Sequence, residues 1–121
     1  MKLILTVVSL FFAGTAFALP ANINSSQAKA YINQNANVCG KVVRIGSGKN
    51  GDRFLNIDGS YPNEIFYFYV PPSTTNINLN QYLNKNICGY GRVEQSPRSD
   101  INTNRIIPQI IIKNESQISF Y

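Results

Sequence analysis

The sequence has no histidine, only two cysteines and only six carboxylates among its 121 residues. Without histidine there is no side chain whose ordinary pKa suits a general base near neutral pH, and the usual zinc and transition-metal ligand sets are excluded. The carboxylates are dispersed along the chain: Asp52, Asp58, Glu64, Glu94, Asp100 and Glu115. The glycine-rich segment 46–51 lacks the lysine-serine pair of a nucleotide-binding loop. We therefore expect no enzyme activity, no metal site and no cofactor.

The longest N-terminal apolar run, residues 3–12, is too short to span a bilayer. It follows Lys2 and precedes small residues at Ala16 and Ala18, the pattern of a secretory signal peptide cleaved after Ala18. We expect residues 1–18 to be a cleaved signal peptide and residues 19–121 to form one domain. The mature protein would then have no integral membrane segment and be periplasmic or secreted in a bacterium. The alternative is a leader that stays attached as a membrane anchor.

The only cysteines are Cys39 and Cys88. In an exported protein an even number of cysteines indicates a disulfide, so we predict a Cys39–Cys88 bond. On the chain-entropy model it would stabilise the fold by about 4 kcal/mol. The alternative is two buried free thiols.

Hydrophobic alternation and β-branched or aromatic runs predict five short strands, at residues 38–45, 53–58, 65–70, 87–94 and 106–113. Before them, Ser25 or Ser26 is expected to cap a short helix that ends at Gln34. Residues 73–84, between the third and fourth strands, have a weak helical or irregular pattern. Five strands with one such plug are typical of an OB-fold, so we predict an all-β, five-stranded OB-fold barrel.

Several motifs are those of a known group of proteins. The first strand contains Val38-Cys39-Gly40-Lys41-Val42, residues 54–63 read FLNIDGSYPN, and Ser116-Gln117-Ile118 stands near the end. In these motifs the chain resembles small exported bacterial OB-fold domains of a nucleic-acid-binding-like family. The resemblance implies the barrel and a binding role, although Cys88 departs from the family pattern. In such a barrel the first and fourth strands are neighbours, which makes the disulfide possible but leaves the register of its cysteines open.

OB-folds usually bind ligands across the second and third strands, between the loops that join strands one to two and four to five. Mapped onto this chain, that face gives the candidate ligand-binding residues Lys49, Arg53, Phe54, Asn56, Tyr67, Tyr69, Arg98 and Arg105. Alternation sends half of the third-strand aromatics into the barrel. Phe66 and Phe68 are the better core candidates, because Tyr67 and Tyr69 can keep their hydroxyls in water.

Aromatic rings ringed by cations suit single-stranded nucleic acid. With Lys2 removed, ten basic residues face six acidic ones, so the mature chain carries a net charge of +4. We therefore expect a binding module for single-stranded nucleic acid or another anionic oligomer, such as an anionic glycan. The alternatives are a sugar- or protein-binding subunit of a secreted assembly, similar to toxin B-subunits, and a structural envelope or stress protein.

Overall fold

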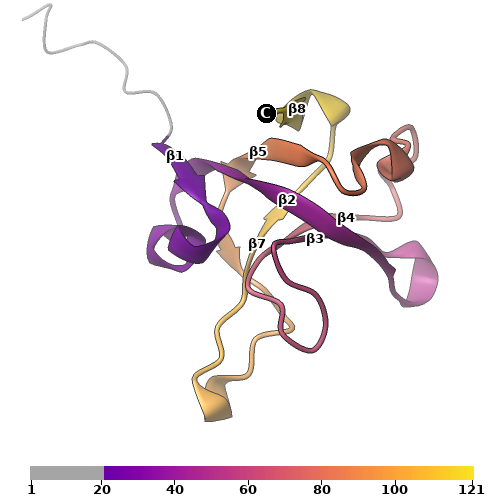
Figure 1. Cartoon of the computed structure of the whole chain (residues 1–121). Coiled ribbons are helices and arrows are strands. Elements are labelled where there is room, and N and C mark those ends of the chain that lie inside the picture. The colour runs from indigo at the N-terminus through magenta and orange to yellow at the C-terminus, as the bar shows by residue number, and fades with distance from the viewer. Residues whose placement is uncertain (1–20) are drawn as a thin grey trace, which may run out of the picture.

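The structure, a computed structural model, describes residues 21–121, and its strands form one curled sheet (Figure 1). The strands are β1 (Ala21–Asn24), β2 (Asn35–Ser47), β3 (Arg53–Ile57), β4 (Tyr67–Val70), β5 (Asn86–Arg92), β6 (Glu94–Gln95), β7 (Pro108–Ile111) and β8 (Ile118–Phe120). They are hydrogen-bonded in the order β6-β7-β4-β3-β2-β5-β8, and β1 pairs with β2. The expected signal peptide, residues 1–18, lies outside the described residues.

The long strand β2 curls the sheet. Its first part, from Asn35 to Lys41, pairs with β5, and its second part, from Val42 to Ser47, pairs with β3. Gly40 lies where β2 passes from one partner to the other, and a Cβ atom there would come within 2.4 Å of the Ile57 side chain. Only glycine permits this close approach, so the residue that ends the V-C-G motif allows the strand to serve two neighbours.

The core lies inside the curl, where alternate residues of β3 and β4 point inward. Leu55 pairs with Phe68 across these strands, and both are fully buried. Phe66 and Phe68 pack edge to face with ring centroids 5.0 Å apart, which confirms the expectation that these two rings fill the barrel. Gly89 of β5 leaves room for Phe68, since a Cβ atom at Gly89 would lie 2.3 Å from its ring.

The predicted strands correspond to β2, β3, β4, β5 and β7, and the mostly-β curled sheet confirms the predicted OB-fold. The sheet also contains three strands that were not predicted: β1, β6 and β8. The plug is present as one turn of 3₁₀ helix, η3 (Leu79–Tyr82). Three further 3₁₀ turns are η2 (Lys49–Gly51), η4 (Ile101–Thr103) and η5 (Glu115–Gln117). Within residues 21–121, no helix has both the length and the apolar character needed to cross a membrane.

The N-terminal helix differs from the prediction. It is the 3₁₀ helix η1 (Ser25–Tyr31), and its cap is Asn24, not Ser25 or Ser26. The Asn24 side chain accepts from the backbone N–H of Gln27, whose side chain accepts in return from the N–H of Asn24. This reciprocal capping box satisfies two backbone donors. Both serines are used elsewhere: Ser25 donates to Asp58 and Ser26 donates to the Asn24 side chain.

The predicted disulfide between Cys39 and Cys88 is present. The two residues lie directly opposite each other in the antiparallel β2–β5 ladder, with Cα atoms 4.0 Å apart. The register that the sequence left open therefore places the cysteines in bonding position. The bond closes a loop with a sequence separation of 49 residues, which contains all of β3 and β4.

Removing this bond is expected to destabilise the protein strongly. Replacing Cys39 and Cys88 together by alanine should lower the free energy of unfolding by about 4 kcal/mol, because the unfolded chain regains the entropy of the open loop. Urea unfolding of the oxidised protein and of the double variant measures the difference. Alkylation under non-reducing conditions is the control, and two reactive thiols in the unmodified protein would contradict the prediction.

Candidate functional site

The outer face of the sheet is set by the pairing of β2, β3 and β4. Residues directly opposite each other in an antiparallel ladder point to the same side. Arg44 of β2 faces Asn56, which in turn faces Tyr67, while Phe54 faces Tyr69. These five residues therefore share the face opposite to the core.

Phe54, Tyr67 and Arg98 form a stack on this face. The ring of Phe54 meets Tyr67 edge to face at 5.2 Å, and the Arg98 guanidinium lies 5.2 Å from the Phe54 centroid and 5.7 Å from that of Tyr67. Tyr67 is only 1% exposed, so the expectation that it keeps its hydroxyl in water is wrong. Its hydroxyl is paired with Ser96, and burial raises the pKa of Tyr67. Tyr67 supports the stack from below, and Phe54 and Arg98 remain accessible.

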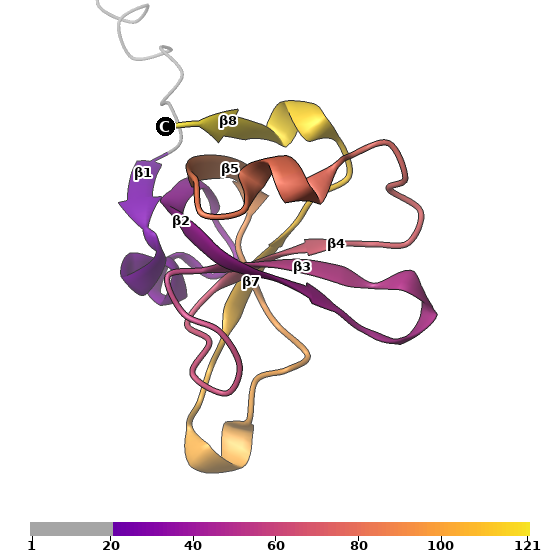
Figure 2. The ribbon, with the colours of Figure 1, turned by 45° about the vertical axis from the view of Figure 1, so that its right-hand side comes forward.

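Glu64 fixes the arginines at this end of the sheet. Its buried carboxylate lies 2.7 Å from Arg98 Nη2 and 3.7 Å from Arg105 Nη2, and Arg105 also donates to the Glu64 backbone carbonyl. The backbone N–H of Arg98 donates to Ser96, which holds the loop at Tyr67. Both views show the segment 58–66 and the loop that carries η4 projecting from the same end of the sheet (Figure 2). These ion pairs join the two loops across that end.

Next to the stack is an open cleft of about 280 Å³. It is lined by Arg44, Gly46, Ser47, Phe54, Asn56, Tyr61 and Arg98. Tyr61 is 66% exposed, whereas Asn56 is 4% exposed. Within the described part of the chain, Asn56 Oδ1 has no hydrogen-bond partner. A buried amide oxygen without a partner costs about 1–3 kcal/mol.

The loop between β2 and β3 is tied to the sheet by Tyr69. The Tyr69 hydroxyl donates to Asp52 Oδ1 at 2.7 Å, and its ring lies 5.6 Å from that of Phe54. The hydrogen bond to the carboxylate, with a smaller effect of burial, raises the pKa of Tyr69. This contact fixes the loop that carries the exposed Lys49.

The structure brings together only part of the predicted set. Phe54, Asn56 and Arg98 line the cleft, while Tyr67 and Tyr69 support it and Lys49 lies at the tip of the neighbouring loop. Arg53 points to the other side of β3 and donates to the carbonyls of Thr74 and Ile77, so its role is to hold the segment after β4. Arg105 is joined to Glu64 and lines a separate hollow with Ile106.

Four lining residues of the cleft are not in the predicted set: Arg44, Gly46, Ser47 and Tyr61, of which Arg44 and Tyr61 have large side chains. Tyr61 lies in a segment, residues 58–63, whose composition is that of a turn, so the sequence does not mark it as a binding residue. Arg44 was overlooked because the β2–β3 register shifts between Val42 and Arg44, so simple alternation along β2 does not give its side. Cross-strand pairing with Asn56 is the signal that finds it, and this requires the register.

The arrangement joins flat rings, two arginines and an amide side chain in one accessible cleft. Rings and guanidinium planes stack on planar ligands, arginines bind phosphate or carboxylate, and the amide can hydrogen-bond a polar edge. Among residues 21–121, no three acidic or cysteine side chains lie together as metal ligands would.

Comparisons with known proteins support the fold. No protein-family model and no curated protein matches the chain. A crystal structure described as an aspartyl-tRNA synthetase from Leishmania major aligns with a TM-score of 0.52 at 8% identity, over 88% of this chain and 21% of that one. An aspartyl-tRNA synthetase from Entamoeba histolytica gives 0.48 at 13% identity, over 75% and 19%. The chain thus spans about a fifth of these synthetases, and the Leishmania alignment shows an OB-fold.

The Tyr69–Asp52 contact predicts a pH effect. Because the pKa of Tyr69 is raised above 10.0, the folded protein holds this proton more tightly than the unfolded chain does. The resulting stabilisation is present below pH 10 and is lost as the pH rises through the raised pKa. In Asp52→Ala, NMR titration of the labelled Tyr69 ring should show a pKa closer to the ordinary value. An unchanged pKa in this variant would exclude Asp52 as the cause.

Proposed function

We propose that the chain is an exported OB-fold module that binds single-stranded nucleic acid in the cleft beside Phe54 and carries out no catalysis. The observation that carries the proposal is the stack of Arg98 on Phe54 and Tyr67 at the edge of a cleft that also contains Arg44. Bases stack on accessible rings and guanidinium groups, and arginines neutralise the phosphates that follow.

Single strands fit this site better than a duplex does. In a duplex the base faces are stacked on one another, whereas a single strand can place a base against Phe54 or the exposed Tyr61. The OB-fold supports the proposal, because this face of the fold is the usual site for oligonucleotides and oligosaccharides. The arginines of the cleft favour oligonucleotides over oligosaccharides, because oligonucleotides carry negative charge.

Export is supported by the leader pattern and by the disulfide. Residues 1–18 have the features of a signal peptide, and the Cys39–Cys88 bond is of the kind that persists in oxidising compartments. The proposed ligand is therefore a nucleic acid outside the cytoplasm.

Salt dependence measures the phosphate contacts. With Arg44 and Lys49 each neutralising one phosphate, log K against log salt should have a slope of about −1.4 for a labelled DNA or RNA single strand. Fluorescence anisotropy of the oxidised protein gives this slope. Arg44→Gln should weaken binding about fivefold at low salt and reduce the slope by about 0.7.

The matched control is Arg92→Gln. Arg92 is exposed and pairs with Asn35 at the opposite end of β2 from Arg44, so this variant loses the same charge far from the cleft. Its affinity and slope should stay close to those of the unmodified protein. Equal losses in both variants would indicate a diffuse charge effect, and absence of binding at low salt would reject the proposal.

A substitution at Asn56 tests ligand binding without lowering the stability of the fold. Asn56→Leu removes a buried oxygen that has no partner among the described residues, so the free energy of unfolding should stay the same or rise. Binding of a single strand should weaken about tenfold, because the cleft loses its polar contact to the base edge. Urea unfolding and anisotropy measure the two effects. A variant that binds normally would show that Asn56 does not contact the ligand.

A further inference from the structure

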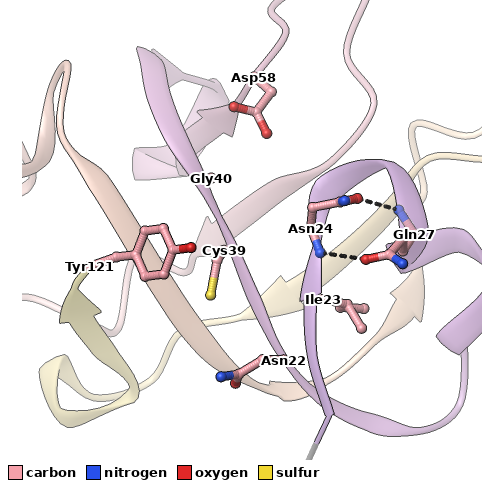
Figure 3. A pocket seen from close by; sticks show the side chains of 8 residues that line it. All are labelled: Asn22, Ile23, Asn24, Gln27, Cys39, Gly40, Asp58 and Tyr121. Atoms are coloured by element: carbon pink, nitrogen blue, oxygen red, sulfur yellow. Dashed lines mark hydrogen bonds between the residues drawn. The ribbon is translucent and has the colours of Figure 1, made fainter.

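We propose that a second pocket, whose lining has amides and a carboxylate in place of arginines, binds an uncharged sugar. It has a volume of about 440 Å³ and is lined by Asn22, Ile23, Asn24, Gln27, Cys39, Gly40, Asp58 and Tyr121. Figure 3 shows Tyr121 on one side of the β2 segment that carries Cys39 and Gly40, and Asn24 and Gln27 on the other side. The pocket shares no lining residue with the cleft beside Phe54.

The amide groups of the pocket are oriented by bonds inside the protein. The side-chain oxygens of Asn24 and Gln27 accept backbone N–H groups at 3.1 and 2.9 Å in the capping box (Figure 3). Asn22 Oδ1 accepts from Asn37 Nδ2 at 3.0 Å. Because each oxygen is engaged, each amide keeps its NH₂ group for a ligand. The pocket therefore offers three pre-oriented donors, and their positions cost no further side-chain ordering.

The acceptor of the pocket is Asp58. Its two carboxylate oxygens each accept one bond within the protein, from the Ser25 hydroxyl and from the backbone N–H of Lys41. These bonds hold the carboxylate in place, and each oxygen can still accept a second hydrogen bond. A hydroxyl group that accepts from an amide NH₂ and donates to a carboxylate fits this combination. A sugar ring presents several such hydroxyls side by side.

Tyr121 provides an apolar platform. Tyr121 is 81% exposed, and its backbone N–H donates to the Asn86 carbonyl at 3.0 Å, which fixes the chain at this point. An exposed aromatic ring beside polar groups can cover the C–H face of a sugar while the amides bind its hydroxyls.

The charges of the pocket exclude an anionic ligand. No lysine or arginine is among its lining residues, and its one ionisable group besides Tyr121 is the Asp58 carboxylate. A phosphate or a uronate would meet a like charge there. This is the reverse of the cleft beside Phe54, where Arg44 and Arg98 are the charged groups. An uncharged sugar is thus the ligand class that satisfies the donors, the acceptor and the ring together.

The experiment is a ¹⁵N NMR titration of the oxidised protein with maltose, cellobiose, lactose and chitobiose, and with glucuronate as the charged comparison. At least one neutral sugar should shift the side-chain NH₂ signals of Asn24 and Gln27 at millimolar concentration, and glucuronate should not. Gln27→Glu keeps an acceptor for the capping box but loses the NH₂ donor, and should weaken sugar binding about tenfold. If no sugar of the panel shifts these signals, the proposal is wrong.

Two exposed tyrosines provide a crossed control. Tyr121→Ala should weaken sugar binding about tenfold and leave binding of single-stranded nucleic acid unchanged. Tyr61 is likewise exposed and lines the other site, so Tyr61→Ala should weaken binding of single-stranded nucleic acid and leave sugar binding unchanged. Sugar binding that survives both Tyr121→Ala and Gln27→Glu would overturn the assignment of this pocket. If the unmodified protein binds a sugar but no single-stranded nucleic acid, the proposed function is wrong and the sugar site stands.

Discussion

Strand β2 pairs with β5 over its first part and with β3 over its second part, and the remaining architecture follows from this sharing. A strand that serves two neighbours must bend, and the bend at Gly40 brings Ile57 too close for any side chain. The Cys39–Cys88 bond lies one residue before this bend and fixes the β2–β5 half. The second part of β2 pairs with β3, and Arg44 and Asn56 lie opposite each other on the outer face of this pair.

A buried carboxylate organises that face. Glu64 is removed from water and would be costly if unpaired, and Arg98 and Arg105 compensate its charge. The ion pair with Glu64 holds the Arg98 guanidinium beside the rings of Phe54 and Tyr67, where the side chain is 36% exposed. A phosphate arriving at Arg98 would have to share it with Glu64, so the arginine acts first as a stacking surface. Arg44 is free of such an ion pair among the described residues and is better suited to neutralise phosphate.

Local patterns predict the fold well where the signal is local. The strands at residues 53–58 and 65–70 alternate or are dense in β-forming residues, and the pairing of Cys39 with Cys88 was predicted from an even count and the expectation of export. Strands β1, β6 and β8 are short, and their pairing partners are set by the curl of the sheet, so no local pattern marks them. The same holds for the site. Tyr67 has the right alternation for an outer face, but Phe54 and Arg98 cover it, and Arg98 arrives from a loop far along the chain.

The two candidate sites lie on different parts of β2 and have different chemical groups. Arg44, after the bend, belongs to a cleft with cations and rings, whereas Cys39 and Gly40, at the bend, belong to a pocket of amides with one carboxylate. A ligand that carries both phosphates and sugar hydroxyls would therefore be drawn to the cleft by charge and repelled from the pocket by Asp58. Because the two sites share no lining residue, their affinities should be independent unless a single long ligand spans the bend.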